Sequence, residues 1–314
     1  MLSRLARISA SAPLRVYARL LSTAAAGAPA PSSGPPAAPT TLAEAAKARV
    51  LDAAVVSPLA AAAVASAGTA SASAVAEALW AAAQLNVTDA DVIAALAAAA
   101  TSAASTFDAT SCGAAAWGGA TLRVSDIAFW RALSGAAARV LDAGKGKPIT
   151  PAVAAQLLTA HHLGPVSNGS GTFLTSASVA ACAAALPAPA AGLAPSSLEL
   201  QAALSELGYE SKRVLGLGGL VDVPLLIGAT GLGPTAVEMD GPAAFLGVAS
   251  ARNSMQTGET RARTRLLREA LGVAVVRVPW WHWAALGSNQ DRLRYLAARI
   301  QGTPQDLVFT KTDA

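Results

Sequence analysis

The chain has 314 residues, of which 13% are charged and 4% aromatic, and its formal net charge is +4. Alanine supplies much of the 53% hydrophobic content, so the positive mean hydropathy overstates the amount of bulky core. The length suits two small domains. Two cysteines, Cys112 and Cys182, exclude a disulfide framework and a cysteine-based zinc site, and they fit a reducing compartment.

Residues 1–41 are expected to lie outside the fold. Residues 1–40 hold four arginines and no acid, with apolar residues between the arginines. An amphipathic, arginine-rich, acid-free start is typical of an organelle transit peptide, and a plain alanine-rich tail is the alternative. The ending Arg19-Leu20-Leu21-Ser22 favours the mitochondrial matrix over the chloroplast stroma. Residues 23–41, rich in Ala, Pro, Ser and Gly, are predicted to be a flexible linker.

Residues 42–209 are predicted to be an all-α region of alanine-rich helices, with Ser, Thr and Asp as caps and Pro and Gly as breaks. This region holds 7 basic and 10 acidic residues, whereas residues 210–314 hold 12 and 9, so the basic excess lies in the leader and the C-terminal third. The uncharged run 53–76 is long enough to cross a membrane, but its side chains are too small to favour insertion.

A repeat of 37 residues is visible inside this region. The segment Leu79–Asp89 matches Ala116–Asp126 at Trp, Leu, Val and Asp positions, and a fainter third copy, Leu157–Leu163, follows at an offset of 41. A period of this size indicates stacked helix pairs of the solenoid type. Coincidence in an alanine-rich sequence remains the alternative for the third copy. The repeated tryptophans are expected to join neighbouring repeats in the core.

The pattern changes near residue 210. Residues 210–302 are predicted to form a compact α/β domain, and residues 303–314 a tail. The expected strands cover 213–217, 220–223, 236–240 and 273–278, and the expected helices cover 257–271 and 289–300. The fold class predicted for the whole chain is therefore α+β, with helical repeats followed by an α/β domain.

Three segments carry a resemblance to a known family. They are Val237-Glu238-Met239-Asp240-Gly241-Pro242, then Thr264-Arg265-Leu266-Leu267-Arg268, then Val275-Val276-Arg277-Val278-Pro279-Trp280-Trp281. In order and spacing this set resembles the RAP domain over about residues 213–302. The preceding repeats resemble those of algal, plant and FAST-kinase-like organellar RAP proteins. The resemblance implies organellar RNA metabolism, such as transcript stability, processing, ribosomal RNA maturation or translation.

The resemblance also implies a fold similar to restriction endonucleases. In that scheme Asp222 takes the first acidic position, Glu238 takes the second, and Asp240 stands where a lysine would be. Three carboxylates converging at strand ends would suit Mg²⁺. The alternative is a structural network of ion pairs, which the missing lysine favours. No catalytic residue, metal site or cofactor is therefore assigned, and Mg²⁺ is expected only for a nuclease.

The candidate RNA contacts are an arginine cluster and one tryptophan: Arg252, Arg261, Arg263, Arg265, Arg268 and Trp281. Arginine binds phosphate through two parallel hydrogen bonds and stacks on bases, although a solvated helix face is the alternative. At least one of Trp280, Trp281 and Trp283 is expected in the core. The leading hypothesis is an RNA-binding protein without enzymatic activity. There are two alternatives. One is a metal-dependent ribonuclease, and the other is a structural component of an organellar ribosome or RNA granule that is held by protein contacts.

Overall fold

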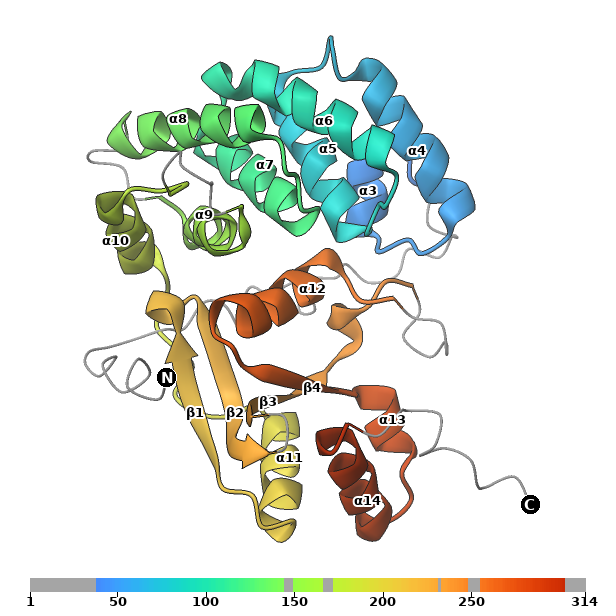
Figure 1. The fold of residues 1–314 in the computed structure, drawn as a ribbon. Helices are drawn as coiled ribbons and strands as arrows, with labels where there is room; N and C mark the ends of the chain where they lie inside the picture. Colours follow the sequence, from blue (N-terminus) through green and yellow to red (C-terminus); the bar gives the residue numbers. More distant parts are fainter. Residues whose placement is uncertain (1–37, 144–148, 166–171, 231–232, 248–254, 303–314) are drawn as a thin grey trace.

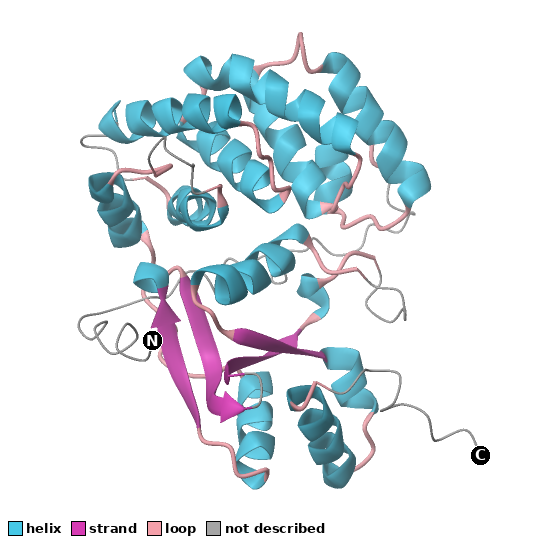
Figure 2. Cartoon of the chain, in the orientation of Figure 1, coloured by secondary structure: helices cyan, strands magenta, loops and turns pink. Residues whose placement is uncertain are grey.

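The computed structural model describes residues 38–143, 149–165, 172–230, 233–247 and 255–302 (Figure 1). The leader, the tail 303–314 and Arg252 lie outside these residues. An all-helical part comes first along the chain, and a sheet flanked by helices follows it (Figure 2), so the fold is α+β. The helices of the first part are α3 (Leu42–Lys47), α4 (Ala53–Ser66), α5 (Ala72–Gln84), α6 (Ala90–Ala103), α7 (Ala109–Thr121), α8 (Ile127–Ala143), α9 (Pro151–Leu163) and α10 (Ser176–Ala185).

Side-chain caps determine where several of these helices begin. Asp52, Ser71, Asp89 and Asp108 precede α4, α5, α6 and α7, and each accepts a hydrogen bond from a backbone amide in the first turn of its helix. Such caps satisfy amides that have no partner inside the helix. The alternation of alanine runs and capping residues therefore divides the region into short, separate helices.

The helices form two layers. Helices α5, α7 and α9 pack side by side in the inner layer, and α4, α6 and α8 pack side by side in the outer one (Figure 1). Small residues allow this close approach: a Cβ atom at Gly118 would lie 2.8 Å from the Leu79 carbonyl oxygen, and one at Gly119 would lie 2.4 Å from the Phe129 ring. Helices α5 and α7 therefore meet nearly backbone to backbone at Gly118, and the Phe129 ring of α8 occupies the space beside Gly119.

The same turn follows three successive inner helices. Arg49, Asn86 and Arg123, spaced 37 residues apart, adopt positive φ angles of 55°, 56° and 60°. One residue later, a valine amide donates to a carbonyl five residues back, and an aspartate then caps the outer helix. Residues 79–89 and 116–126, which the sequence comparison paired, contain two of these turns. The turn at Arg49 lies one period earlier and was missed, because residues 42–52 lack the tryptophan that marks the other two.

The second part is built on a sheet of β1 (Ser211–Gly216), β2 (Val221–Thr230), β3 (Gly233–Asp240) and β4 (Ala274–Pro279), in the order β1-β2-β3-β4. The first two pairings are antiparallel, and β3 and β4 are parallel. A parallel pair needs a crossover, which here contains α12 (Gly258–Arg265) and the π-helical turn Leu266–Ala270. The helix predicted for residues 257–271 is thus present, but its second half is π-helical and not α-helical.

Helices cover both faces of this sheet. On one face, α11 (Pro195–Glu206) and α14 (Asn289–Ile300) share an apolar core with β2 and β3. On the other face, α12 lies between the sheet and the inner helices (Figure 1). We expected α11 to belong to the helical region 42–209, but it packs on the sheet. Its Leu200, Ala203 and Leu204 form one apolar stripe, and an open sheet face needs such a cover.

From the sequence we expected no membrane-spanning segment. In the described part of the chain, no helix is both long enough and apolar enough to cross a membrane.

Candidate nucleic-acid interface

Helix α12 and its π-helical turn present arginines in two directions. Arg261, Arg265 and Arg268 follow the i, i+4, i+7 spacing of one helix side, whereas Arg263 points from the opposite side. One side meets the sheet, and the other meets the ends of the inner helices. The predicted arginine cluster is therefore divided between two different surroundings.

Arg263 faces the sheet, where it pairs with Glu238 of β3. Its Nε lies 3.1 Å from both carboxylate oxygens of Glu238, and its Nη2 also pairs with Glu238. Arg277 of β4 approaches the same carboxylate at 3.3 Å, and the Glu238 side chain is only 7% exposed. Burial opposes the charged form of Glu238, but the two arginines outweigh it and lower the pKa of Glu238. Glu238 is thus ionised and pairs with both Arg263 and Arg277.

Asp240, at the end of β3, lies next to this pair. Its carboxylate accepts a hydrogen bond of 2.5 Å from Arg277 and one of 3.4 Å from Gln256. Burial raises the pKa of Asp240 more than the single arginine lowers it. Arg277 also donates to the Thr264 hydroxyl at 2.8 Å, which ties β4 to α12. Glu238 and Asp240 are therefore both paired with arginines inside the fold.

Asp222 does not join Glu238 and Asp240. Its neighbours Val221 and Val223 pack in the core shared with the helical part, so strand alternation directs Asp222 to the opposite face of the sheet. There it accepts a 2.8 Å hydrogen bond from Arg213. The predicted convergence of three carboxylates is therefore not found. Within the described ranges, no group of three or more His, Cys, Asp or Glu side chains is placed to bind a metal ion.

The other side of α12 binds the ends of the inner helices. Arg265 donates to the Ala120 carbonyl at the end of α7 at 2.7 Å, and to the Leu163 carbonyl at the end of α9 at 3.4 Å. Arg261 donates to the Asn86 side chain, just after α5, at 2.5 Å. A cation at a helix C-terminus satisfies free carbonyls and favours the helix dipole. Arg265, only 16% exposed, thus acts as a link between the two parts.

The first residue of α12 touches the backbone of α5. A Cβ atom at Gly258 would lie 2.2 Å from the Ala83 carbonyl oxygen, so only glycine fits. The neighbouring Glu259 amide donates to the Gln84 side chain at 3.3 Å, and the Asn86 side chain donates to the Gln256 carbonyl at 2.5 Å. The two parts of the molecule therefore meet through specific contacts.

Three exposed arginines remain along this junction: Arg123, Arg261 and Arg268. We call them the seam cations. Arg123, whose side chain is 67% exposed, pairs with Glu269 at 2.7 Å, and Arg265 shares that carboxylate. Burial, and then the charges of Arg265 and Arg123, lower the pKa of Arg261. For Arg268 no ion-pair partner is found among the described residues.

Arg123 was not among the predicted contacts. It lies in the second repeat copy, in the left-handed turn that follows α7. The 37-residue repeat places it at the position of Asn86, which itself holds Arg261. This equivalence to Asn86 could have identified Arg123 from the sequence, because residues at equivalent repeat positions lie along one edge of a stack.

The tryptophans lie on α13 (Trp280–Ala285), directly after β4. Trp283 is buried, and its indole donates to Glu199 of α11 at 3.0 Å, so it is a core residue as expected for at least one of the three. Trp281 is half-buried, with its ring centroid 4.5 Å from that of Phe245. Its edge-on contact with Phe245 leaves only part of the ring accessible for stacking on a base.

No protein-family model matches the chain, and no curated protein matches it significantly.

Proposed function

We propose that the chain is an RNA-binding protein of organellar RNA metabolism, formed by a helical-repeat stack and a C-terminal RAP-like domain. Three features support the proposal. The turns at Arg49, Asn86 and Arg123 recur with a 37-residue period, as in a solenoid. The motifs that resemble the RAP domain lie on β3, α12 and β4. The acid-free leader supports a mitochondrial location.

The observation that carries the proposal is the set of seam cations. Arg123, Arg261 and Arg268 are exposed along the junction, and Glu269 is the carboxylate paired with Arg123 there. Exposed arginine guanidinium groups match the phosphates of a nucleic-acid backbone. RNA is the expected ligand because the family resemblance points to organelle transcripts.

The seam cations revise the set of contacts expected from the sequence. Arg261 and Arg268 stay in it and Arg123 joins it. Arg263 and Arg265 are instead assigned to holding the sheet and the inner helices in place, because they contact Glu238 and helix-end carbonyls. Trp281 is a secondary contact at most, since Phe245 covers part of its ring.

The test is the salt dependence of RNA binding. Fluorescence anisotropy with a labelled single-stranded RNA is measured over a range of salt concentrations for the wild type and for Arg123→Ala/Arg268→Ala. Each lost phosphate contact lowers the slope of log affinity against log salt by roughly 0.7, so the double variant should lose about 1.4. A matched control, Lys212→Ala/Arg294→Ala, removes two exposed cations from β1 and α14.

We expect the control to bind like the wild type, apart from a small general effect of charge. The proposal fails if the seam variant keeps the wild-type affinity and slope. It also fails if both double variants weaken binding equally, because the protein would then attract RNA only through its net charge.

A further inference from the structure

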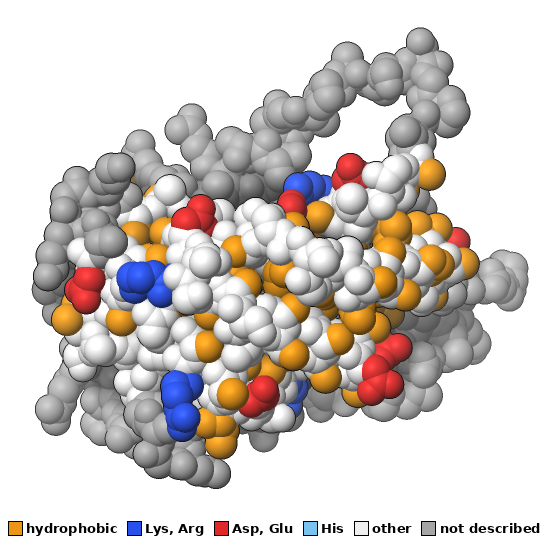
Figure 3. All heavy atoms as spheres, turned by 90° about the horizontal axis from the view of Figure 1, so that it is seen from above, with side chains coloured by type: hydrophobic (Ala, Val, Ile, Leu, Met, Phe, Trp, Pro, Cys, Tyr) orange, Lys and Arg blue, Asp and Glu red, His pale blue; other side chains and the backbone are white. Residues whose placement is uncertain are grey.

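One uncharged helix lies at each end of the helical part. Helix α4 contains no Lys, Arg, Asp or Glu, and Ala60 is the residue that it buries. Helix α10, at the opposite end in Figure 1, also has no charged residue and buries Cys182. Seen from above (Figure 3), hydrophobic side chains are spread over the helical part, with only scattered charged ones. Stacked helical repeats normally end in polar caps that keep them soluble, so an uncharged helix at each end suggests contacts with further protein.

A groove opens at the α4 end because α3 is short. Helix α3 has 6 residues, whereas α5 and α7 have 13 each. Thr41 caps α3 in a capping box with Glu44, and Pro39 stands just before, so the helix begins two turns late by comparison with α5. The first two turns of α5 therefore lack the inner-helix neighbour that α7 provides on its other side.

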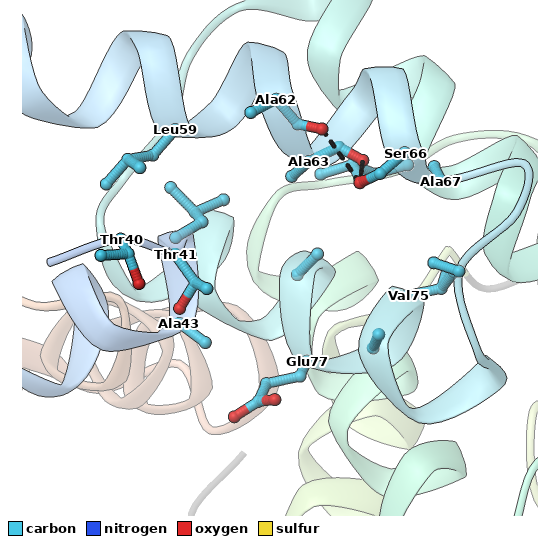
Figure 4. Close-up of a pocket in the computed structure, with 15 residues that line it drawn as sticks. Thr40, Thr41, Ala43, Leu59, Ala62, Ala63, Ser66, Ala67, Val75 and Glu77 are labelled. Carbon is cyan, nitrogen blue, oxygen red and sulfur yellow. Dashed lines mark hydrogen bonds between the residues drawn. The ribbon is translucent and has the colours of Figure 1, made fainter.

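The groove is apolar and encloses about 280 Å³ (Figure 4). Leu59 and Ala63 of α4 line one wall, and Val75 and Ala78 of α5 line the other. At its rim, Glu77 pairs with Lys47 at 2.7 Å, so the charge there is already balanced. The small side chains of both walls suit a helix that also presents small side chains, as α7 does to α5 inside the stack.

Helix α10 presents a surface of this kind. Its exposed alanines share one side of the helix at i, i+3, i+4 and i+7 spacing: Ala177, Ala180, Ala181 and Ala184. With 10 residues, α10 is about 15 Å long, enough to lie along the two missing turns. We propose that the groove of one copy binds α10 of a second copy, so that the helical layer continues head to tail between molecules.

This interface joins two different surfaces, so a pair of molecules still has one free groove and one free α10. Such contacts form rings where the geometry closes and open chains where it does not. Because the contact is apolar, added salt should not weaken it, in contrast to association through RNA.

The test measures the mass of the full chain after nuclease treatment, by sedimentation velocity across a wide range of concentrations. Two variants each block one half of the interface: Ala62→Arg on the groove wall and Ala181→Arg on α10, both at exposed positions. Ala61→Arg is the matched control, since Ala61 is exposed beside Ala62 but does not line the groove. Far-UV circular dichroism confirms that the variants fold.

We expect the wild type and Ala61→Arg to associate as concentration rises, and each blocking variant alone to stay monomeric. A mixture of the two blocking variants should form one-to-one dimers and nothing larger, because it contains one intact groove and one intact α10. The proposal is overturned if the wild type is monomeric throughout, as it would be if residues 1–37 filled the groove. Association that nuclease removes, or a mixture that remains monomeric, would also overturn it.

Discussion

The arginines of α12 and its π-helical turn serve two different purposes. On the side that faces the sheet, Arg263 meets Glu238, a carboxylate that is nearly buried and also paired with Arg277. On the other side, Arg261 and Arg268 are exposed at the edge of the inner helices. These arginines lie within eight residues of one another. The surroundings of each one, rather than the density of positive charge, determine whether it holds the fold or is available to a ligand.

The largest effect is expected from removing the buried anion. Glu238→Ala leaves Arg263 and Arg277 without the carboxylate that both contact. Breaking a buried ion pair from one side costs about 3–5 kcal/mol of unfolding free energy. Urea denaturation measures it. Asp222→Ala is the control, since its half-exposed pair with Arg213 should contribute only about 1 kcal/mol or less. Equal losses in the two variants would show that Glu238 has no special structural role.

A smaller effect is expected at the junction of the two parts. Gly258→Ala places a Cβ atom 2.2 Å from the Ala83 carbonyl oxygen, so α12 must move away from α5. Overpacking of this kind costs about 1–3 kcal/mol, although alanine has the higher helix propensity. The unfolding free energy and the rate of limited proteolysis test it. Gly287→Ala, with open space around the position, should change neither. If Gly258→Ala stabilises the protein, as propensity alone predicts, the two parts are not tightly docked.

The sequence was sufficient to predict much of the fold. The final helix has the predicted bounds, Asn289–Ile300, and β4 at Ala274–Pro279 differs from its expected range by one residue at each end. Both segments have a strong apolar pattern and a clear boundary residue, Ser288 before the helix and Pro279 at the end of the strand. Local patterns of this kind depend little on the rest of the molecule.

The partners of the charged side chains could not be predicted in the same way. Asp222 and Glu238 both lie on strands of the sheet, but their side chains occupy opposite faces. The pairing of β1 with β2 contains a register shift. A shift of one residue moves the following side chains of a strand to the opposite face of the sheet, so the face of each side chain could not be read from the sequence. Likewise, Arg265 meets carbonyls of α7 and α9 more than 100 residues away in sequence. Such contacts follow from tertiary packing and leave no local pattern.

Arg263→Ala and Arg268→Ala, compared in both stability and RNA binding, distinguish an arginine that holds the fold from one that binds RNA. Arg263→Ala should lower the unfolding free energy by about 2 kcal/mol or more, since it removes charged hydrogen bonds to buried Glu238. Arg268→Ala should change the unfolding free energy by no more than about 0.5 kcal/mol, because the side chain is exposed, but it should weaken RNA binding and reduce its salt dependence. Two variants that lose stability equally, or an Arg268→Ala variant that binds RNA as the wild type does, would contradict the assignment of Arg263 to the fold and of Arg268 to RNA binding.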